Sequence, residues 1–194
     1  MEKQVRRVVT SHEADGKAVV LFDGAPAKIN ARPESGVKSW LLWVTHSTPA
    51  DVSGSRDGAD RTIGIPPPPG GSIFRIVDFH PTDDKKLPPD YMARDMGADH
   101  APSKTWPPRH PAMHRTRSVD YAIVLSGEID MLLDDSEIHL QAGDVLVQQA
   151  TNQCVGQPRD RTVPHCLCAN RRQGSLIGPA RKQERGTAWP SSST

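Results

Sequence analysis

The chain has 194 residues and a formal net charge of +1, which fits one domain and argues against a nucleic-acid or anionic-membrane partner. Its 18 prolines and 15 glycines favour a turn-rich β protein over a helical bundle. No apolar run is long enough to span a bilayer, the N-terminus lacks the apolar core of a signal peptide, and Cys154, Cys166 and Cys168 make no disulfide framework, so we expect a soluble cytoplasmic protein.

Residues 1–71 are predicted to form N-terminal strands and a proline-rich connector that pack on the main body. The β-rich stretches QVRRVVT and KAVVLF flank Asp15-Gly16, whose glycine can adopt the positive φ of a tight turn, so we expect a hairpin. Residues 37–45 (VKSWLLWVT) form a third strand. Residues 48–71 are rich in Ser, Gly, Asp and Pro and include four consecutive prolines, which favour a stiff connector.

Residues 72–153 carry the strands of the predicted main body, beginning with SIFRIVDF at 72–79. Residues 80–113 are long for a loop and are interpreted as a lid or a surface arm with a short helix in DYMARDMGAD, and His80, His100 and His110 in it are expected to be surface histidines. The stretches SVDYAIVL, EIDMLL, EIHL and DVLVQQ follow, separated by polar or glycine turns. Such short strands without a helical period predict a small antiparallel barrel or sandwich.

A short pattern of residues surrounds the first of these four strands. It consists of His114, Thr116, Asp120-Tyr121, the turn LSGE at 125–128, Gly143-Asp144 and Thr151-Asn152. The pattern resembles the cupin superfamily, and within it the small single-domain cupins with a His-x-Thr-x3-Asp-Tyr motif. The chain has Thr116, Ala150 and Gln153 where cupins have His, Gly and His. The resemblance implies an all-β, cupin-type antiparallel β-barrel, jelly-roll-like, with an N-terminal strand extension, and a homodimer.

His114 and Asp120 are the candidate catalytic and metal-binding residues. Strand alternation places them on one face with Thr116 and Val124, which we expect to contact a small-molecule substrate. With Gln153 as a third ligand, this face predicts a divalent metal (Fe, Mn, Ni or Zn) that binds weakly or not at all, because an amide replaces an imidazole. In the structural alternative, Asp120 satisfies donors at the barrel rim and His114 is a packing residue.

Three functions are compatible with this pattern. The resemblance implies a cupin-type oxidoreductase, dioxygenase-like with a non-haem metal, that acts on a small organic, polyketide or aromatic metabolite. A metal-free isomerase, cyclase or decarboxylase would use Asp120 as general base and His114 as acid. A non-catalytic cupin that binds a ligand or dimerises is the third, and the altered second motif favours it.

Residues 154–194 are predicted to be an aberrant basic tail. Residues 151–194 hold seven Lys or Arg and two Asp or Glu, and apolar alternation vanishes, so we expect the closing strands of the barrel to be missing and the tail to be disordered. Degenerate codons for residues 154–173, read from the second base, allow AWVNRGTEPCRIAFVLIDAK, which supplies an apolar closing strand. One inserted base in a His codon would then produce Gln153-Cys154, and we hypothesise that the sequence from Gln153 onward is a frame-shift product.

Overall fold

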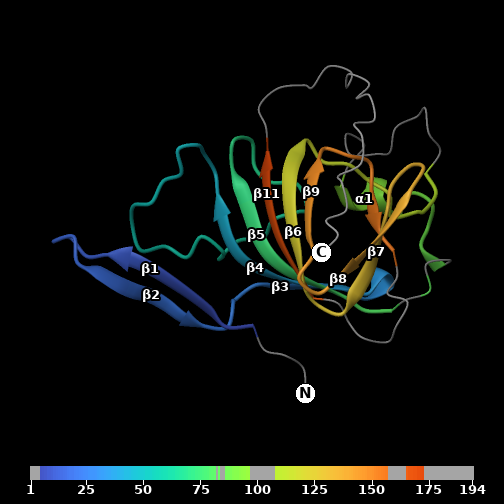
Figure 1. The fold of residues 1–194 in the computed structure, drawn as a ribbon. Coiled ribbons are helices and arrows are strands. Elements are labelled where there is room, and N and C mark those ends of the chain that lie inside the picture. The colour runs from blue at the N-terminus through green and yellow to red at the C-terminus, as the bar shows by residue number, and fades with distance from the viewer. Residues whose placement is uncertain (1–4, 82, 84–85, 97–107, 157–164, 173–194) are drawn as a thin grey trace, which may run out of the picture.

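The computed structural model describes residues 5–81, 83, 86–96, 108–156 and 165–172, which form antiparallel strands with one short α-helix (Figure 1). The predicted all-β class is confirmed. A two-stranded ribbon pairs β1 (Arg7–His12) with β2 (Ala18–Gly24). A six-stranded sheet has the order β3 (Ile29–Arg32), β4 (Val37–Thr45), β5 (Ser72–Phe79), β11 (His165–Arg172), β6 (Ser118–Ser126) and β9 (Val145–Gln149). A three-stranded sheet has the order β10 (Cys154–Val155), β7 (Glu128–Leu132) and β8 (Glu137–Gln141).

The N-terminal hairpin forms as predicted and projects from one side of the six-stranded sheet (Figure 1). Gly16 has φ 86°, a left-handed conformation that glycine adopts without a side-chain clash, and the Gly16 N–H donates to the Glu13 carbonyl over 2.9 Å. The strands at residues 37–45 and 72–79 also have the predicted bounds, whereas the four-residue β3 is too short to give a periodic signal.

The core lies between the six-stranded and three-stranded sheets. Val124 of β6 packs there against Ile129 and Met131 of β7 and Leu140 of β8. A second cluster joins Leu41, Val44 and Ile73 of the larger sheet to Ala59, so the predicted connector covers part of that sheet. Alternation along each strand explains the arrangement, because every second side chain points to the same face.

The strand β11 corrects the prediction that no closing strand follows Gln153. It lies between β5 and β6, with Leu167 paired to Ile76 on one side and to Ile123 on the other. Without β11, the facing edges of β5 and β6 would leave backbone hydrogen-bonding groups unpaired. The strand β10 also follows Gln153 and pairs with β7. The remainder of the predicted tail, residues 157–164 and 173–194, lies outside the described residues.

The long segment between β5 and β6 contains the predicted short helix, α1 (Tyr91–Met96). His80 is exposed, whereas His100 lies outside the described residues. Across the part of the chain that the structure describes, no helix has both the length and the apolar character that a membrane span requires.

Candidate functional site

A cavity of about 210 Å³ lies between the two larger sheets and contains all five site residues that the sequence predicts: His114, Thr116, Asp120, Val124 and Gln153. Most of its wall is apolar, with side chains from strands of both sheets. These include Val77, Phe79, Ile129, Met131 and Leu140. The long segment before β6 contributes Leu87, Tyr91 and Met92, so the predicted lid borders the cavity. A cavity with an apolar wall and a few polar groups is typical of small-molecule sites.

His114 and Gln153 are held together by an isolated antiparallel bridge. The N–H of each residue donates to the carbonyl of the other over 2.9 Å, which places the two side chains next to each other. His114 Nδ1 is 2.8 Å from the Ala112 carbonyl, and because a carbonyl only accepts, Nδ1 carries the proton in this contact. His114 Nε2 is then the ring nitrogen with a lone pair, and Gln153 Nε2 donates to it over 3.3 Å.

Asp120 sits in a ring of three oxygen-bearing side chains at the start of β6. Ser118 Oγ donates to Asp120 Oδ1 over 2.5 Å, Thr116 Oγ1 donates to Asp120 Oδ2 over 3.3 Å, and the two hydroxyl oxygens are 2.6 Å apart. Two hydroxyl protons cannot serve all three oxygen–oxygen contacts. A proton on Asp120 Oδ1 that is donated to Ser118 Oγ would let Ser118 donate to Thr116 Oγ1, so that every contact has a proton.

Burial raises the pKa of Asp120 above its ordinary value, which agrees with this proton count. The hydrogen bonds from Ser118 and Thr116 act in the opposite direction, as does the positive charge of Arg75. The carboxyl group therefore holds a proton more readily than an exposed aspartate does. Such a group stays protonated to a higher pH than a solvated carboxylate, which suits it to exchange a proton with a substrate.

The donor set of the cavity fits a divalent metal. His114 Nε2 has a lone pair, Asp120 supplies a carboxylate, and Gln153 Oε1 is buried with no hydrogen-bond partner among the described residues. Nitrogen and oxygen donors of this kind suit iron, manganese, nickel or zinc. A neutral amide oxygen is a weaker ligand than an imidazole. Within the described ranges, no three His, Cys, Asp or Glu side chains are grouped to hold a metal.

The sequence interpretation missed several polar residues of the cavity, above all Arg75, Gln148 and His110. Arg75 interrupts the apolar strand SIFRIVDF, and Gln148 is buried on β9, so a polar residue on the inward face of a strand was the available signal. His110 was interpreted as a surface residue, and the structure corrects this, because it lines the cavity. It precedes β6 in a loop, where alternation cannot assign a face.

Comparison of the sequence with known proteins finds relatives in fungal biosynthesis clusters, although no family model matches the chain. The phomopsin biosynthesis cluster protein C′ of Diaporthe leptostromiformis is 31% identical over 155 residues, which cover 75% of this chain and 67% of that protein. The oryzines biosynthesis cluster protein J of Aspergillus oryzae is 31% identical over 162 residues, 80% of this chain and 75% of that protein.

A third relative is the cupin-domain-containing oxidoreductase fogC of Aspergillus ruber, which is 26% identical over 151 residues. This match covers 76% of the chain and 62% of the relative. Among solved structures, the chain is similar to the Cnp3 cupin domain of Schizosaccharomyces pombe, with a TM-score of 0.43 and 8% identity over 88% of this chain and 90% of that one.

Proposed function

We infer the function from the premise that this chain belongs to the cupin superfamily. We propose that it is an enzyme of secondary metabolism, a cupin-type oxidoreductase that acts on a small organic metabolite of a polyketide or aromatic kind. Two observations support this proposal: the relatives named above, and a cavity whose wall is mostly apolar with a few polar groups, as in small-molecule sites. The polar side chains that line this cavity indicate the chemistry that it supports.

One observation carries the metal part of the proposal: His114, Asp120 and Gln153 line one cavity, and the Gln153 amide oxygen is buried there without a hydrogen-bond partner among the described residues. These three side chains would hold a divalent metal, with iron as the first candidate and manganese, nickel or zinc as alternatives. Bound iron would supply open coordination positions for a substrate and for dioxygen. The amide in the set predicts weak binding.

The side chains of this chain have their own roles in the proposal. Ser118 and Thr116 hold the Asp120 carboxyl group in one orientation through their hydroxyl groups. The apolar wall, which includes Val124, excludes water around a bound substrate and strengthens polar contacts there. We expect the Thr116 hydroxyl group and the Val124 side chain to contact the substrate.

Iron titration of the purified chain tests the metal part. We expect weak, saturable binding of one iron per chain that is lost in His114→Ala. The matched control is His12→Ala, which removes an exposed imidazole from the projecting ribbon and should leave iron binding unchanged. Iron-dependent uptake of dioxygen in the presence of a substrate would support the oxidoreductase assignment. A wild-type chain without saturable iron binding would refute the metal part.

A metal-free isomerase, cyclase or decarboxylase is the second candidate, and the oxygen ring around Asp120 favours it. A carboxyl group with a raised pKa and a lone-pair nitrogen of His114 line the same cavity, an arrangement that suits proton transfer without a metal. Turnover that continues in the presence of EDTA would support this candidate over the oxidoreductase. A bound metabolite without turnover would support a non-catalytic, ligand-binding cupin instead.

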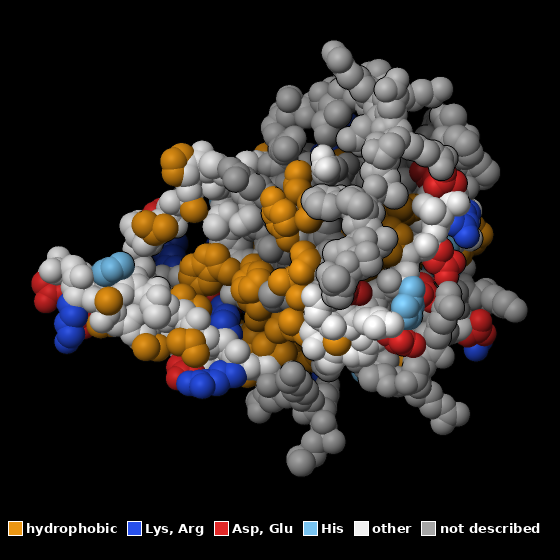
Figure 2. Space-filling model, in the orientation of Figure 1, with side chains coloured by type: hydrophobic (Ala, Val, Ile, Leu, Met, Phe, Trp, Pro, Cys, Tyr) orange, Lys and Arg blue, Asp and Glu red, His pale blue; other side chains and the backbone are white. Residues whose placement is uncertain are grey.

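We also propose a homodimer that covers an apolar face of the six-stranded sheet. Ala169 pairs with both Phe74 and Tyr121, and Tyr121 pairs with Val147, so these residues lie in one row, in which Phe74, Tyr121 and Val147 are exposed. Figure 2 shows further hydrophobic side chains on the projecting ribbon. Exposed apolar surface of this kind is typical of interaction sites.

Sedimentation analysis tests the dimer with a pair of matched variants. Val147→Lys places a charge in the exposed row and should shift the chain to a monomer, whereas Val52→Lys alters an exposed loop valine and should not. A monomeric wild-type chain at micromolar concentration would argue against the dimer.

A further inference from the structure

A second cavity, of about 290 Å³, adjoins the first on the inner side of β3, β4 and β5. Asn30, Ser39 and Arg75 line both cavities, so the two are neighbours. The second cavity is lined by cationic and polar side chains to a much greater extent than the first. Its charged members among the described residues are Lys28, Arg61 and Arg75, and none of its lining residues is acidic.

Of the three cations of this cavity, Arg61 makes the fewest polar contacts with the rest of the described chain. Its Nε is buried and has no hydrogen-bond partner among the described residues, and its guanidinium acts on Asp57 only through its charge. Arg75 differs, because its Nη2 donates to the carbonyls of Gly64 and Ile65 over 3.1 Å each. These bonds fix Arg75 at the border between the two cavities.

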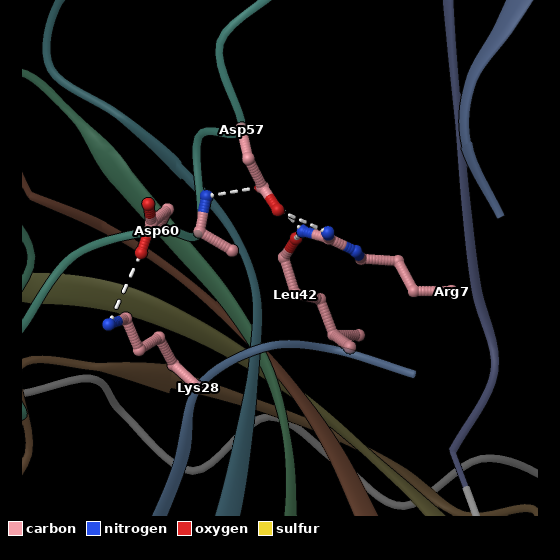
Figure 3. Close-up of polar contacts among 6 residues, drawn as sticks. Arg7, Lys28, Leu42, Asp57 and Asp60 are labelled. Carbon is pink, nitrogen blue, oxygen red and sulfur yellow. Dashed lines mark hydrogen bonds and ion pairs between the residues drawn. The ribbon is translucent and has the colours of Figure 1, made fainter. Parts of the chain in front are cut away.

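Polar contacts of Asp57 and Asp60 anchor the loop that carries Arg61 (Figure 3). Asp57 accepts hydrogen bonds from the Arg7 guanidinium of the ribbon and from the Ala59 N–H. Asp60 forms an ion pair with Lys28, with 3.2 Å between Asp60 Oδ1 and Lys28 Nζ. Because Asp57 and Asp60, which precede Arg61 in the loop, are both anchored, the loop holds Arg61 at the cavity wall.

The ion pairs near the second cavity engage its cations unequally. Lys28 has Asp60 as its partner, and Arg7 has Asp57, which leaves Arg61 without a carboxylate of its own. One uncompensated guanidinium suits a singly charged anion, and a guanidinium binds a carboxylate with two parallel hydrogen bonds.

We propose that Arg61, with Arg75, binds the carboxylate of the substrate, and that the rest of the substrate extends past Asn30 and Ser39 into the cavity of His114 and Asp120. This inference rests on the proposed function in that both sites receive one small organic molecule. It narrows the substrate to an organic monocarboxylate. Arg61 is a binding residue in this scheme and lies outside the set that would hold the metal.

The test compares benzoate with benzamide, its neutral isostere, by isothermal titration at low ionic strength. We expect the wild-type chain to bind benzoate about tenfold more tightly than benzamide, as one charge-assisted contact predicts. Arg61→Gln should weaken benzoate binding about tenfold and leave benzamide binding unchanged, and Arg61→Lys should retain part of the difference. The matched control is Arg56→Gln, which removes an exposed charge from the same loop and should change neither affinity.

Several results would overturn the inference. They are equal binding of benzoate and benzamide, binding of neither, and wild-type benzoate affinity in an Arg61→Gln chain. Displacement of benzoate by an equal concentration of inorganic phosphate would overturn the carboxylate class. The thermal midpoint of each variant shows whether it is folded. The titration requires no turnover and no metal, so it can fail while iron binding at His114 succeeds, and the reverse also holds.

Discussion

Asp57→Asn should destabilise the chain at neutral pH, because it removes the carboxylate that pairs with Arg7. The Arg7 and Asp57 side chains are only 9% and 15% exposed, and Arg7 Nη1 lies 2.7 Å from Asp57 Oδ1. Exposed ion pairs contribute about 0–1 kcal/mol, whereas loss of one partner of a fully buried pair costs about 3–5 kcal/mol. For this largely buried pair we expect a loss of about 2–3 kcal/mol in the free energy of unfolding.

This loss corresponds to a thermal midpoint that is lower by about 5–10 °C, since 1 kcal/mol shifts a domain of this size by about 2–4 °C. The loss should also depend on pH. The hydrogen bond from Arg7 is the main cause that holds the pKa of Asp57 below its ordinary value. A lowered folded-state pKa stabilises the fold above the unfolded pKa of about 3.9, and the contribution is lost as the pH falls through the folded value.

The measurement is thermal unfolding of the wild-type and Asp57→Asn chains between pH 7 and pH 2. Asp23→Asn is the matched control, because Asp23 accepts two 2.7 Å hydrogen bonds from Arg6 on the same ribbon, in an ion pair whose side chains are 70% and 45% exposed. That variant should leave the midpoint almost unchanged. The reasoning would be refuted by an Asp57→Asn midpoint equal to wild type at pH 7, or by a difference that persists undiminished at pH 2.

Three further predictions follow from single positions. Gly58→Ala would place a Cβ 2.7 Å from Cε2 of Trp43, so the ring must move, and we expect a loss of about 1–3 kcal/mol and altered tryptophan fluorescence. Gln153→His would put an imidazole beside His114 and should tighten iron binding at least about tenfold in the same titration, and unchanged affinity would contradict the proposed ligand set. The strand β11 removes the missing-strand argument for the frame-shift hypothesis, and sequencing of the gene is its remaining test: one inserted base in the codon of Gln153 would support it, and an unambiguous reading without that base would end it.

The sequence by itself determined the strands and predicted that four residues share one face. Alternation and turn residues located β4 and β5 at their observed bounds and the four strands from β6 to β9 within one or two residues. The same alternation grouped His114, Thr116, Asp120 and Val124 on one face, and all four line one cavity. These predictions succeed because the side-chain period of a strand is a local property that neighbouring residues specify.

Only the tertiary structure decided which segments meet. The strand β11 has a polar, basic sequence, and its place between β5 and β6 follows from the open edges of those strands, which lie far from it in the chain. Arg61 and Arg75 reach neighbouring cavities because a loop and a strand, 14 positions apart in sequence, fold against one another. The period of a strand indicates which face of the sheet a side chain occupies. The packing of distant segments determines which residues that side chain contacts.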